Sequence, residues 1–251
     1  MLSVLTLNAG LTQVRLFNWI IWEAVQDCES RIHRIMQGIT KLDPDIVCLQ
    51  EVYQPAHRKM LRTLTQYPYM VCYPSHGNVI MSKYPVHHSQ RNVFTASFWF
   101  ERLYTFMGFV HTIIKLPEGN CCVSNVHTTC GASWYKWDSV IVKQVQKLQL
   151  SQLLNRVSRH KKSIVCGDFN AGPDLNVDVY NLMHEYTDAC AGSKEPTWSH
   201  ENVYNKNGYF SKQPSCRIDH IFVSKKFKVK SAKIVMKNGE SDHYGVLARL
   251  E

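Results

Sequence analysis

The sequence predicts an α/β protein in which helices cover the faces of β-sheets, that is, a layered α/β sandwich. Short runs rich in Val, Ile, Leu and Tyr recur along the chain with turn residues between them, which is typical of strands. Two longer segments, 28–42 and 140–157, instead carry apolar residues at helical spacing. Because many of the strand-like runs are short and hairpin-like, we do not expect a purely parallel sheet.

The expected strands extend from the first residues to the last. Several of them, such as DIVCLQEV and KSIVCGDFN, are almost continuously apolar, as expected for strands buried on both faces. In chain order the strand-like runs are 2–8, 45–52, 69–74, 77–86, 107–116, 121–128, 162–170, 216–224 and 244–250.

Both expected helices are amphipathic. Segment 28–42 has its apolar residues at Ile32, Ile35, Met36, Ile39 and Leu42. Segment 140–157 has them at Val145, Leu148, Leu150, Leu153 and Leu154. Each spacing places an apolar stripe along one side of a helix, and we expect this side to pack on a sheet.

The length and composition are those of a folded protein, and we expect residues 1–251 to form one domain that acts as a monomer. Of the 251 residues, 45% are hydrophobic and 20% charged, which excludes a disordered or fibrous chain. The net charge of +9 favours a polyanionic partner, either nucleic acid or an anionic membrane surface. A solvated basic surface without such a partner explains the charge equally well.

The cysteines and the start of the chain bear on the compartment. Nine cysteines are scattered without a CxxC pair, and several lie inside apolar runs, so we interpret them as reduced core residues. The first residues, MLSVLTLNAG, lack the basic start and the cleavage site of a signal peptide and are too short to span a membrane. An intracellular protein, cytoplasmic or nuclear, without a signal peptide or transmembrane helix is expected.

Asn8, Glu51 and His127 each stand at the end of an apolar run. For Asn8, after LSVLTL, a turn or helix-capping residue is the common alternative. Glu51 follows DIVCLQ, and a carboxylate after several buried residues is costly unless it is paired or bound to a metal. His127 follows CCVSNV, although a histidine at a strand end is more often structural. None of the three indicates a site without the others.

Asp168 and Asn170 lie in IVCGDFNAGPD, where a buried strand runs into Gly167. Two residues apart on an extended chain, they would project to the same side. A carboxylate beside an amide suits a metal-bound phosphate, because one can hold a cation or water while the other binds an oxyanion. An Asx turn is the alternative interpretation.

Asp219, Asp242 and His243 complete the set of polar candidates. Asp219 lies in an apolar strand, CRIDHIFVS, and needs a partner such as a histidine, whereas His220 faces the other way and is interpreted as a plain strand residue. In SDHYGVLARL, an aspartate that holds one nitrogen of His243 leaves the other free to take a proton from water, and Asp242 is available to a hard cation. The whole set favours Mg²⁺- or Mn²⁺-assisted attack of water on phosphorus.

Seven of these stretches, in this order, resemble the endonuclease/exonuclease/phosphatase superfamily. They are TLNAG, DIVCLQEV, GNVIMSKYPV, NVHTT, VCGDFNAGPD, RIDHIFVS and SDHYGVLARL. The superfamily includes deoxyribonuclease-like nucleases, neutral sphingomyelinases and inositol-polyphosphate phosphatases. The resemblance implies a four-layer α/β sandwich with two packed mixed sheets, and an active hydrolase.

The resemblance also implies a role for each candidate. Glu51 would be the principal metal ligand with Asn8 beside it, and Asp242 would assist the metal or the phosphate. Asp168 and Asn170 would orient the attacking water and the phosphate. His243 would be the general base, steered by Asp219. His127 would bind the scissile phosphate and help the leaving group. The implied cofactor is Mg²⁺ or Mn²⁺.

The substrate is either a lipid head group or nucleic acid. The layout is similar to neutral sphingomyelinases and to tyrosyl-DNA phosphodiesterase-like enzymes, which share a Thr-Trp stretch like that in PTWSHENVYNKN. Ala9-Gly10 replaces the Trp-Gly that usually follows the first Asn in sphingomyelinases. A sphingomyelinase-like phosphodiesterase is the favoured interpretation; a nuclease or DNA-end phosphodiesterase is the second, and a non-catalytic nucleic-acid-binding module the third.

Two aromatic stretches bear on this choice. Residues 16–22 include Leu16, Phe17, Trp19, Ile20, Ile21 and Trp22, and residues 98–104 include Phe98, Trp99, Phe100 and Tyr104. If these side chains are exposed, they could enter a lipid interface or stack on bases. Packing in the core is the alternative.

Overall fold

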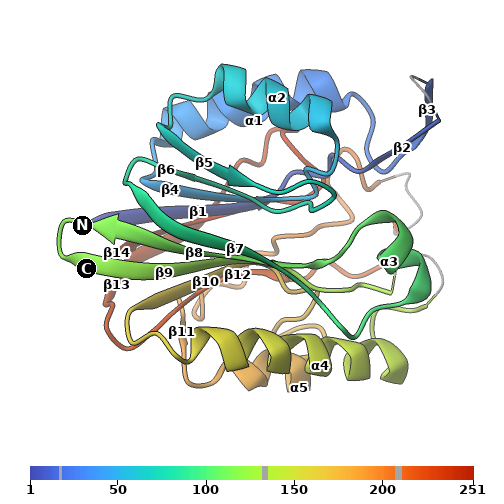
Figure 1. The fold of residues 1–251 in the computed structure, drawn as a ribbon. Coiled ribbons are helices and arrows are strands. Elements are labelled where there is room, and N and C mark those ends of the chain that lie inside the picture. The colour runs from blue at the N-terminus through green and yellow to red at the C-terminus, as the bar shows by residue number, and fades with distance from the viewer. Residues whose placement is uncertain (17–18, 132–134, 207–210) are drawn as a thin grey trace.

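A computed structural model gives the fold of the chain and describes residues 1–16, 19–131, 135–206 and 211–251. Within these ranges, two six-stranded sheets pack face to face, and helices cover the outer face of each sheet (Figure 1). The predicted α/β sandwich is therefore confirmed, with helix, sheet, sheet and helix as its four layers.

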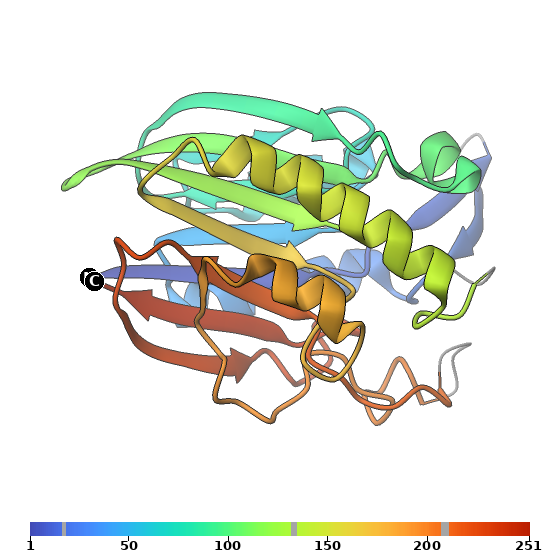
Figure 2. The same ribbon diagram turned by 90° about the horizontal axis from the view of Figure 1, so that it is seen from below.

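The first sheet contains both ends of the chain. Its strand order is β13 (Val229–Val235), β14 (Gly245–Leu250), β1 (Leu2–Asn8), β4 (Ile46–Gln50), β6 (Val79–Ser82) and β5 (Tyr69–Cys72). β1 runs parallel to β4 and antiparallel to β14, so the sheet is mixed. The pairing of β1 with β14 brings the two termini side by side (Figure 2).

The second sheet repeats this mixed arrangement. Its strand order is β11 (Thr187–Asp188), β12 (Asp219–Val223), β10 (Ser163–Asp168), β9 (Gly119–His127), β8 (Gly108–Leu116) and β7 (Val86–Val93). β9 and β10 are parallel, whereas the other neighbours are antiparallel. The register places Asp168 opposite both His127 and Asp219, so three of the predicted residues share one edge of this sheet.

Helices on the two outer faces bury the sides of the strands that point away from the centre. On the first sheet these are α1 (Cys28–Leu42) and α2 (Pro55–Leu64), and on the second α4 (Val140–Val157) and α5 (Val177–Tyr180) (Figure 1). A 3₁₀ turn, η2 (Asn181–Met183), follows α5. Within the described chain, none of the helices has both the length and the apolar character needed to cross a membrane.

Alternation along the strands divides the core into three apolar layers. Val4 and Cys48 face the layer between the sheets together with Ile164, whereas Leu5 and Val47 face α1. A third cluster lies between the second sheet and α4. All nine cysteines are free thiols, as predicted, and all but Cys72 and Cys130 are buried.

The sequence did not predict the elements that are polar or exposed. These are β7, β11, β13, helices α2, α3 (Trp99–Tyr104) and α5, and a hairpin of β2 (Gln13–Leu16) and β3 (Trp19–Glu23). β7 lies at a sheet edge and reads VHHSQRNV, with few buried side chains, because one side of an edge strand remains in water. Elements that bury few side chains therefore lack apolar periodicity, and this pattern cannot predict them.

Helix α4 has the predicted bounds and buries Leu150 and Leu153 as expected, but its buried face also includes two glutamines. Leu148 was expected to be covered and is 61% exposed, whereas Gln146 and Gln149 are fully buried. Gln146 Nε2 donates to the carbonyl oxygens of Thr129 and Asn170 at 2.8 and 2.9 Å, and Gln149 Oε1 accepts from the Thr129 amide at 3.0 Å. The helix thus satisfies the backbone of the loops that follow β9 and β10, which an apolar stripe could not do.

A cluster of buried amides connects the two sheets. Asn125 on β9 donates from Nδ2 to the carbonyl oxygens of Leu49 and Val79 in the first sheet, at 2.8 and 2.9 Å. Its Oδ1 accepts from Gln50 Nε2 at 2.6 Å. Asn78 Nδ2 donates to the Asn125 carbonyl oxygen at 2.7 Å. These directional bonds fix the position of β9 relative to β4, and with it the edge at which the polar residues meet.

We predict that Asn125→Ala lowers the free energy of unfolding by about 3 kcal/mol or more, because three buried hydrogen bonds are lost and their partners stay buried. Urea denaturation measures the change. Asn120→Ala, an exposed position on the same strand, is the matched control and should have little effect. Equal stability of the two variants would show that the amide cluster does not hold the sheets together.

Candidate active site

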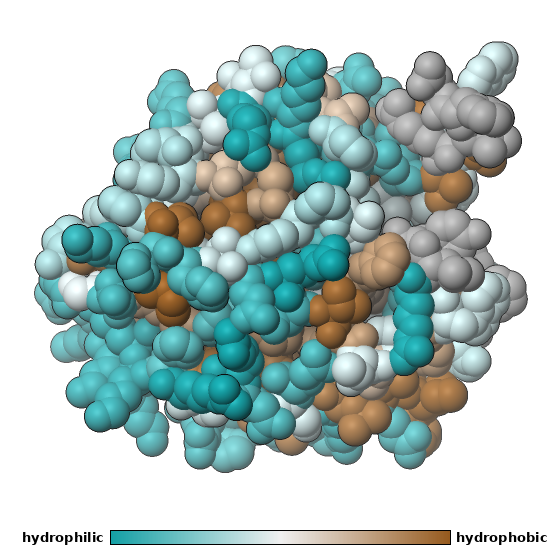
Figure 3. Space-filling view, viewed as in Figure 1, coloured by the Kyte–Doolittle hydropathy of each residue, from teal (hydrophilic) through white to brown (hydrophobic). Residues whose placement is uncertain are grey.

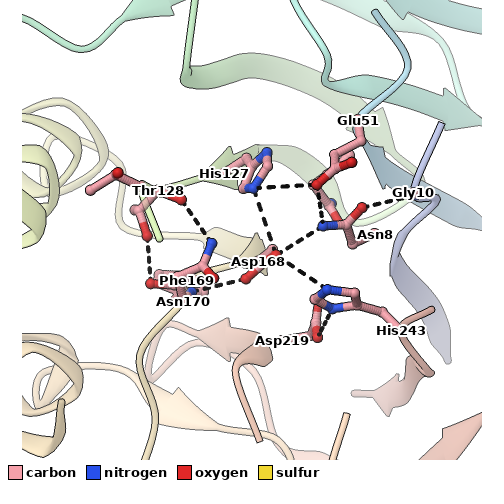
Figure 4. A network of polar contacts seen from close by, with 12 residues as sticks. Asn8, Gly10, Glu51, His127, Thr128, Asp168, Phe169, Asn170, Asp219 and His243 are labelled. Atoms are coloured by element: carbon pink, nitrogen blue, oxygen red, sulfur yellow. Dashed lines mark hydrogen bonds and ion pairs between the residues drawn. The ribbon is translucent and has the colours of Figure 1, made fainter. Parts of the chain in front are cut away.

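Polar side chains from both sheets meet at one edge of the sandwich (Figure 4). Asn8, the last residue of β1, donates from Nδ2 to Glu51 Oε1 at 3.0 Å and to Asp168 Oδ2 at 2.9 Å. Its Oδ1 accepts from the Gly10 amide at 3.0 Å. Asn8 therefore connects a carboxylate after β4 with a carboxylate at the end of β10, across the two sheets.

Glu51 is held in an unusual backbone conformation. Its φ angle is +63°, in the left-handed region that non-glycine residues seldom adopt, and this turns the side chain toward Asn8. Thr12 Oγ1 donates to Glu51 Oε2 at 2.7 Å. Burial and the nearby Asp242 charge raise the pKa of Glu51, although the hydrogen bonds from Asn8 and Thr12 act in the opposite direction.

Asp168 lies at the centre of the cluster and is 1% exposed. His127 Nε2 is 3.7 Å from Asp168 Oδ2 and 4.0 Å from Glu51 Oε1, so the imidazole faces both carboxylates. Burial and the charge of Asp219 raise the pKa of Asp168 to about 6. Burial lowers the pKa of His127, which makes its imidazole neutral near pH 7.

Asp219 and His243 form the tightest pair of the site. Asp219 Oδ2 is 2.9 Å from His243 Nδ1, and the carboxylate is completely buried. Because an ionised carboxylate only accepts hydrogen bonds, Nδ1 carries the proton and Nε2 is left to face the cluster, 3.9 Å from Asp168 Oδ2. Thr197 Oγ1 accepts from the Asp219 amide at 2.9 Å and so fixes the start of β12.

The carboxylates around His243 control its protonation. Burial alone lowers the pKa of this histidine, but the charges of Asp219, Asp168 and Asp242 outweigh that effect and raise the pKa well above the ordinary value. The carboxylates therefore favour the protonated imidazole as long as no cation lies among them. A positive charge placed among the same carboxylates would bring the pKa of His243 down again.

Asp242 and Asn170 lie at the periphery of the cluster. Asp242 Oδ1 accepts from Ser241 Oγ at 3.0 Å, and it lies so close to Gly10 that a Cβ added there would be 2.3 Å from it. The strand β14 begins only at Gly245, so the Asp-His pair lies in a bend before the strand and not within it.

The expectation that Asp168 and Asn170 project to the same side of an extended chain is wrong. β10 ends at Asp168, the Asn170 amide donates to Asp168 Oδ1 at 2.9 Å, and Asn170 has a φ angle of +45°. This is an Asx turn, the alternative that the sequence also allowed. Asn170 Nδ2 donates to the Thr128 carbonyl oxygen at 2.9 Å. The side-chain amide of Asn170 thus contacts the loop after His127, while its backbone N–H supports Asp168.

His220 does not join the cluster. Its Nδ1 is 3.2 Å from Asp188 Oδ2 and its Nε2 is 2.9 Å from the Ala171 carbonyl oxygen. Arg217 Nη1 contacts the same Asp188 oxygen at 2.6 Å. The sequence treated His220 as a plain strand residue, and the structure shows instead a buried ion-pair network that gives Asp188 a lowered pKa.

The residues of the cluster fit a hard divalent cation. Four carboxylates, those of Glu51, Asp168, Asp219 and Asp242, lie in one region, and their ion pairs within the described chain involve only the imidazoles of His127 and His243. Asp219 Oδ1 is buried without a hydrogen-bond partner in that part of the chain. Oxygen donors with excess negative charge are the ligands that Mg²⁺ and Mn²⁺ prefer.

Several residues that hold the site were not predicted. They are Gly10, Thr12, Thr197 and Ser241, whose Oγ donates to the Asn8 carbonyl oxygen at 2.6 Å. Thr197 lies in the PTWSH stretch, so the motif was visible, but the contact that it makes was not. Small hydroxyl side chains carry no periodic signal, and their partners are distant in sequence.

The fold agrees with the comparisons to known proteins. The model of the Endonuclease/Exonuclease/phosphatase family matches residues 22–243, and the chain belongs to this family. No curated protein matches the sequence.

Solved structures share the fold at low sequence identity. Beta toxin 275-280 from Staphylococcus aureus is 19% identical, with a TM-score of 0.79 and 99% of each chain covered. Sphingomyelinase C from Streptomyces griseocarneus is 16% identical, with a TM-score of 0.78 and 98% of each chain covered. TDP2 from D. rerio, complexed with a single-strand DNA product, is 16% identical, with a TM-score of 0.76, and the match covers 100% of this chain and 98% of that one. One structure of the staphylococcal beta toxin contains bound magnesium ions.

We predict that Asp219→Asn lowers the pKa of His243 in the metal-free protein, because the charge that raises it is removed. The pKa of His243 is higher in the folded protein than its value of about 6.5 in the unfolded chain. This difference stabilises the folded wild type fully below about pH 6.5, and the stabilisation is lost as the pH rises through the folded-state pKa. The variant should therefore lose less stability with rising pH over that interval. NMR titration and urea denaturation measure the two effects. The NMR signals of the exposed His87 serve as internal control and should be the same in both proteins.

Proposed function

We propose that the protein is a divalent-metal-dependent phosphodiesterase whose single domain, residues 1–251, hydrolyses a sphingomyelin-like lipid, with His243 as the general base. The observation that carries the proposal is the Asp219–His243 pair, whose free Nε2 faces Asp168 at 3.9 Å. A separation of this size leaves room for water bonded to both groups. The same constellation of carboxylate, imidazole and a second carboxylate is what activation of water requires.

The residues of the chain divide the reaction between them. His243 Nε2 takes a proton from the water that Asp168 orients, and the hydroxide oxygen forms a bond to phosphorus. The bond from phosphorus to the leaving oxygen then breaks. Glu51, with Asn8 and Asp242 beside it, would hold Mg²⁺ or Mn²⁺. The bound ion supplies positive charge that stabilises the negative charge on the phosphate oxygens and opposes the carboxylates that raise the pKa of His243.

His127 is placed to serve the phosphate and the leaving group. In the free protein its pKa is lowered by burial. A phosphate anion beside the ring would favour the protonated form, because an opposite charge raises the pKa of an imidazole. His127 would then donate a hydrogen bond to the phosphate and its proton to the leaving alkoxide. Asn170 supports this arrangement through its hydrogen bond to the carbonyl oxygen of Thr128, the next residue.

The exposed β2–β3 hairpin favours a lipid substrate. Its second strand leaves Trp19, Ile20, Ile21 and Trp22 between 50% and 77% exposed. Consecutive strand residues point to opposite faces, so both faces of the hairpin are apolar, which suits insertion into a lipid interface better than packing on a flat partner. Thr12, next to β2, contacts Glu51, so the hairpin begins at the active site. Phe17 and the Leu16 side chain lie outside the described residues.

Further apolar side chains are exposed outside the hairpin. Trp99 on α3 is 65% exposed, whereas Phe98 packs in the core; the Tyr104 side chain lies outside the described residues. Val140 and Ile141, at the beginning of α4, are 68% and 43% exposed, and Figure 3 shows apolar side chains gathered over that region. A membrane surface approached by this side of the molecule would meet the hairpin, α3 and the active-site edge together (Figure 1).

A nuclease or DNA-end phosphodiesterase is the second candidate. The net charge of +9 favours the phosphate backbone of nucleic acid as well as an anionic leaflet. A Mg²⁺-dependent panel of sphingomyelin vesicles, plasmid DNA, single-stranded oligonucleotides and 5′-tyrosyl DNA distinguishes the candidates. Cleavage of DNA alone would reject the lipid proposal. Tight, salt-sensitive nucleic-acid binding without any cleavage would instead indicate a binding module.

We predict that His243→Ala lowers kcat by about 100-fold to 10,000-fold, the range expected when a general base is removed, and leaves the fold intact. The assay is hydrolysis of the substrate that the panel identifies, and circular dichroism checks the fold. His184→Ala, an exposed histidine away from the cluster, is the matched control. Near-normal turnover by His243→Ala would reject its role as base.

We predict that replacing both Trp19 and Trp22 with Ser reduces hydrolysis of sphingomyelin in vesicles by about tenfold or more, since two interfacial anchors are lost. Hydrolysis of a short-chain, water-soluble phosphodiester should be unchanged. Leu148→Ser, which also removes an exposed apolar side chain, is the control. Equal loss with both substrates would mean that the hairpin supports the catalytic residues and does not anchor the protein.

A further inference from the structure

A second group of potential metal ligands lies far from the active site. His111 on β8, Cys122 on β9 and His160 in the turn after α4 bring their ligand atoms within 4.8 Å of one another. Cys122 is the fourth residue of β9 and His127 is its last, five residues or roughly 16 Å apart along an extended strand. The group is thus separate from the carboxylate cluster and has a different donor chemistry.

The three side chains share the side of the second sheet that α4 covers. The register places His111 opposite Ser124, on the same face as Cys122 two residues away. Cys121 points the other way, into the layer between the sheets. His160 reaches the group from the turn that connects α4 to β10. His111 and Cys122 are 1% and 2% exposed, in a layer that is otherwise apolar along α4.

The distances within the group are close to those of a tetrahedral zinc site. Metal–ligand bonds of about 2.3 Å to sulfur and 2.0 Å to nitrogen, at the tetrahedral angle, put sulfur and nitrogen roughly 3.5 Å apart and two ligating imidazole centroids roughly 5 Å apart. Cys122 Sγ is 3.5 Å from His111 Nδ1 and 3.8 Å from His111 Nε2. The ring centroids of His111 and His160 are 5.0 Å apart.

Hydrogen bonding alone does not account for this arrangement. Ser124 Oγ is 3.1 Å from His111 Nδ1, which occupies one nitrogen of that ring. The second nitrogen, Nε2, has the thiol sulfur of Cys122 at 3.8 Å, too far for a strong hydrogen bond. His111 is buried, and a metal bound at Nε2 would give its second nitrogen a stronger partner than the thiol does.

We propose that His111, Cys122 and His160 bind Zn²⁺ at a three-ligand site that fastens the turn after α4 to the second sheet. Cysteine sulfur and imidazole nitrogen are the ligands that zinc prefers, whereas Mg²⁺ prefers the oxygen donors at the other end of β9. The Cys122 thiol releases its proton to solvent when the zinc–sulfur bond forms. Three protein ligands leave one tetrahedral position for water.

Charged neighbours reduce the affinity of this site without blocking it. Arg156 is within electrostatic range of all three side chains, and His88 and Arg159 each act on one of them. Arg156 Nη2 donates a hydrogen bond to Gln90 Oε1 on β7, so its guanidinium is engaged outside the group. The thiolate formed on binding offsets one positive charge.

Titration with Co²⁺ under reducing conditions, in the presence of saturating Mg²⁺, tests the proposal in the full chain. Cobalt reports a thiolate ligand through a charge-transfer absorption band, and none of the residues in the carboxylate cluster is a cysteine. We expect one such band per chain, its displacement by Zn²⁺, and an increase in melting temperature when Zn²⁺ is added.

Two variants and a control decide the assignment. Cys122→Ser should abolish the band, and His160→Gln, at a half-buried position that tolerates change, should weaken Co²⁺ binding by at least about 100-fold. Cys72→Ser, which removes a partly exposed thiol on β5, should leave the absorption band and the Co²⁺ affinity unchanged. The absence of a thiolate band in the folded wild type, or a band of full intensity and affinity in His160→Gln, would overturn the proposal.

Discussion

The hydrogen bonds of Asn125 are the interaction on which the candidate site depends. Gln50, its partner in the first sheet, directly precedes Glu51, and Asn125 lies two residues before His127. Each sheet supplies one half of the site. The amide of Asn125 therefore fixes the distance between these two halves. Apolar contacts between two sheets have no direction and tolerate small displacements, whereas a buried amide with three partners does not. The 2.9 Å contact from Asn8 to Asp168 is possible only at that spacing.

Two of the buried aspartates in the second sheet, Asp188 and Asp168, have opposite surroundings, which distinguish a structural ion pair from the candidate site. Asp188 is paired with Arg217 and His220, so its pKa is lowered and its charge is fully compensated. Asp168 has an amide and imidazoles as neighbours, and its pKa is raised to about 6. A buried carboxylate without a compensating charge lowers the stability of the fold, and such groups are retained in enzymes where a bound ligand compensates the charge. The uncompensated charge around Asp168 is therefore the physical basis for the divalent cation in the proposed mechanism.

Whether an element could be predicted from the sequence depends on whether its side chains are buried in a regular pattern. The buried strands and helix α1 were visible because their apolar residues follow the period of the element. The edge strand β7 and the hairpin β2–β3 were not, since residues in water need no apolar pattern. On α4 the apolar pattern wrongly predicted that Leu148 is buried. Gln146 and Gln149 are buried there because they form hydrogen bonds with the backbone of a neighbouring loop. The candidate site residues were identified as polar side chains at strand ends and by their order along the chain.

The sequence by itself determined which residues are candidates for the site, because a buried carboxylate or imidazole at the end of an apolar run is costly unless it has a partner or a ligand. It also determined the layered fold through hydrophobic periodicity. Only the tertiary structure decided that Asn170 forms a turn beside Asp168 and that Thr12 and Ser241 support the site. The reason is that each contact joins strands or loops whose relative position is set by sheet packing, and no local pattern encodes that position.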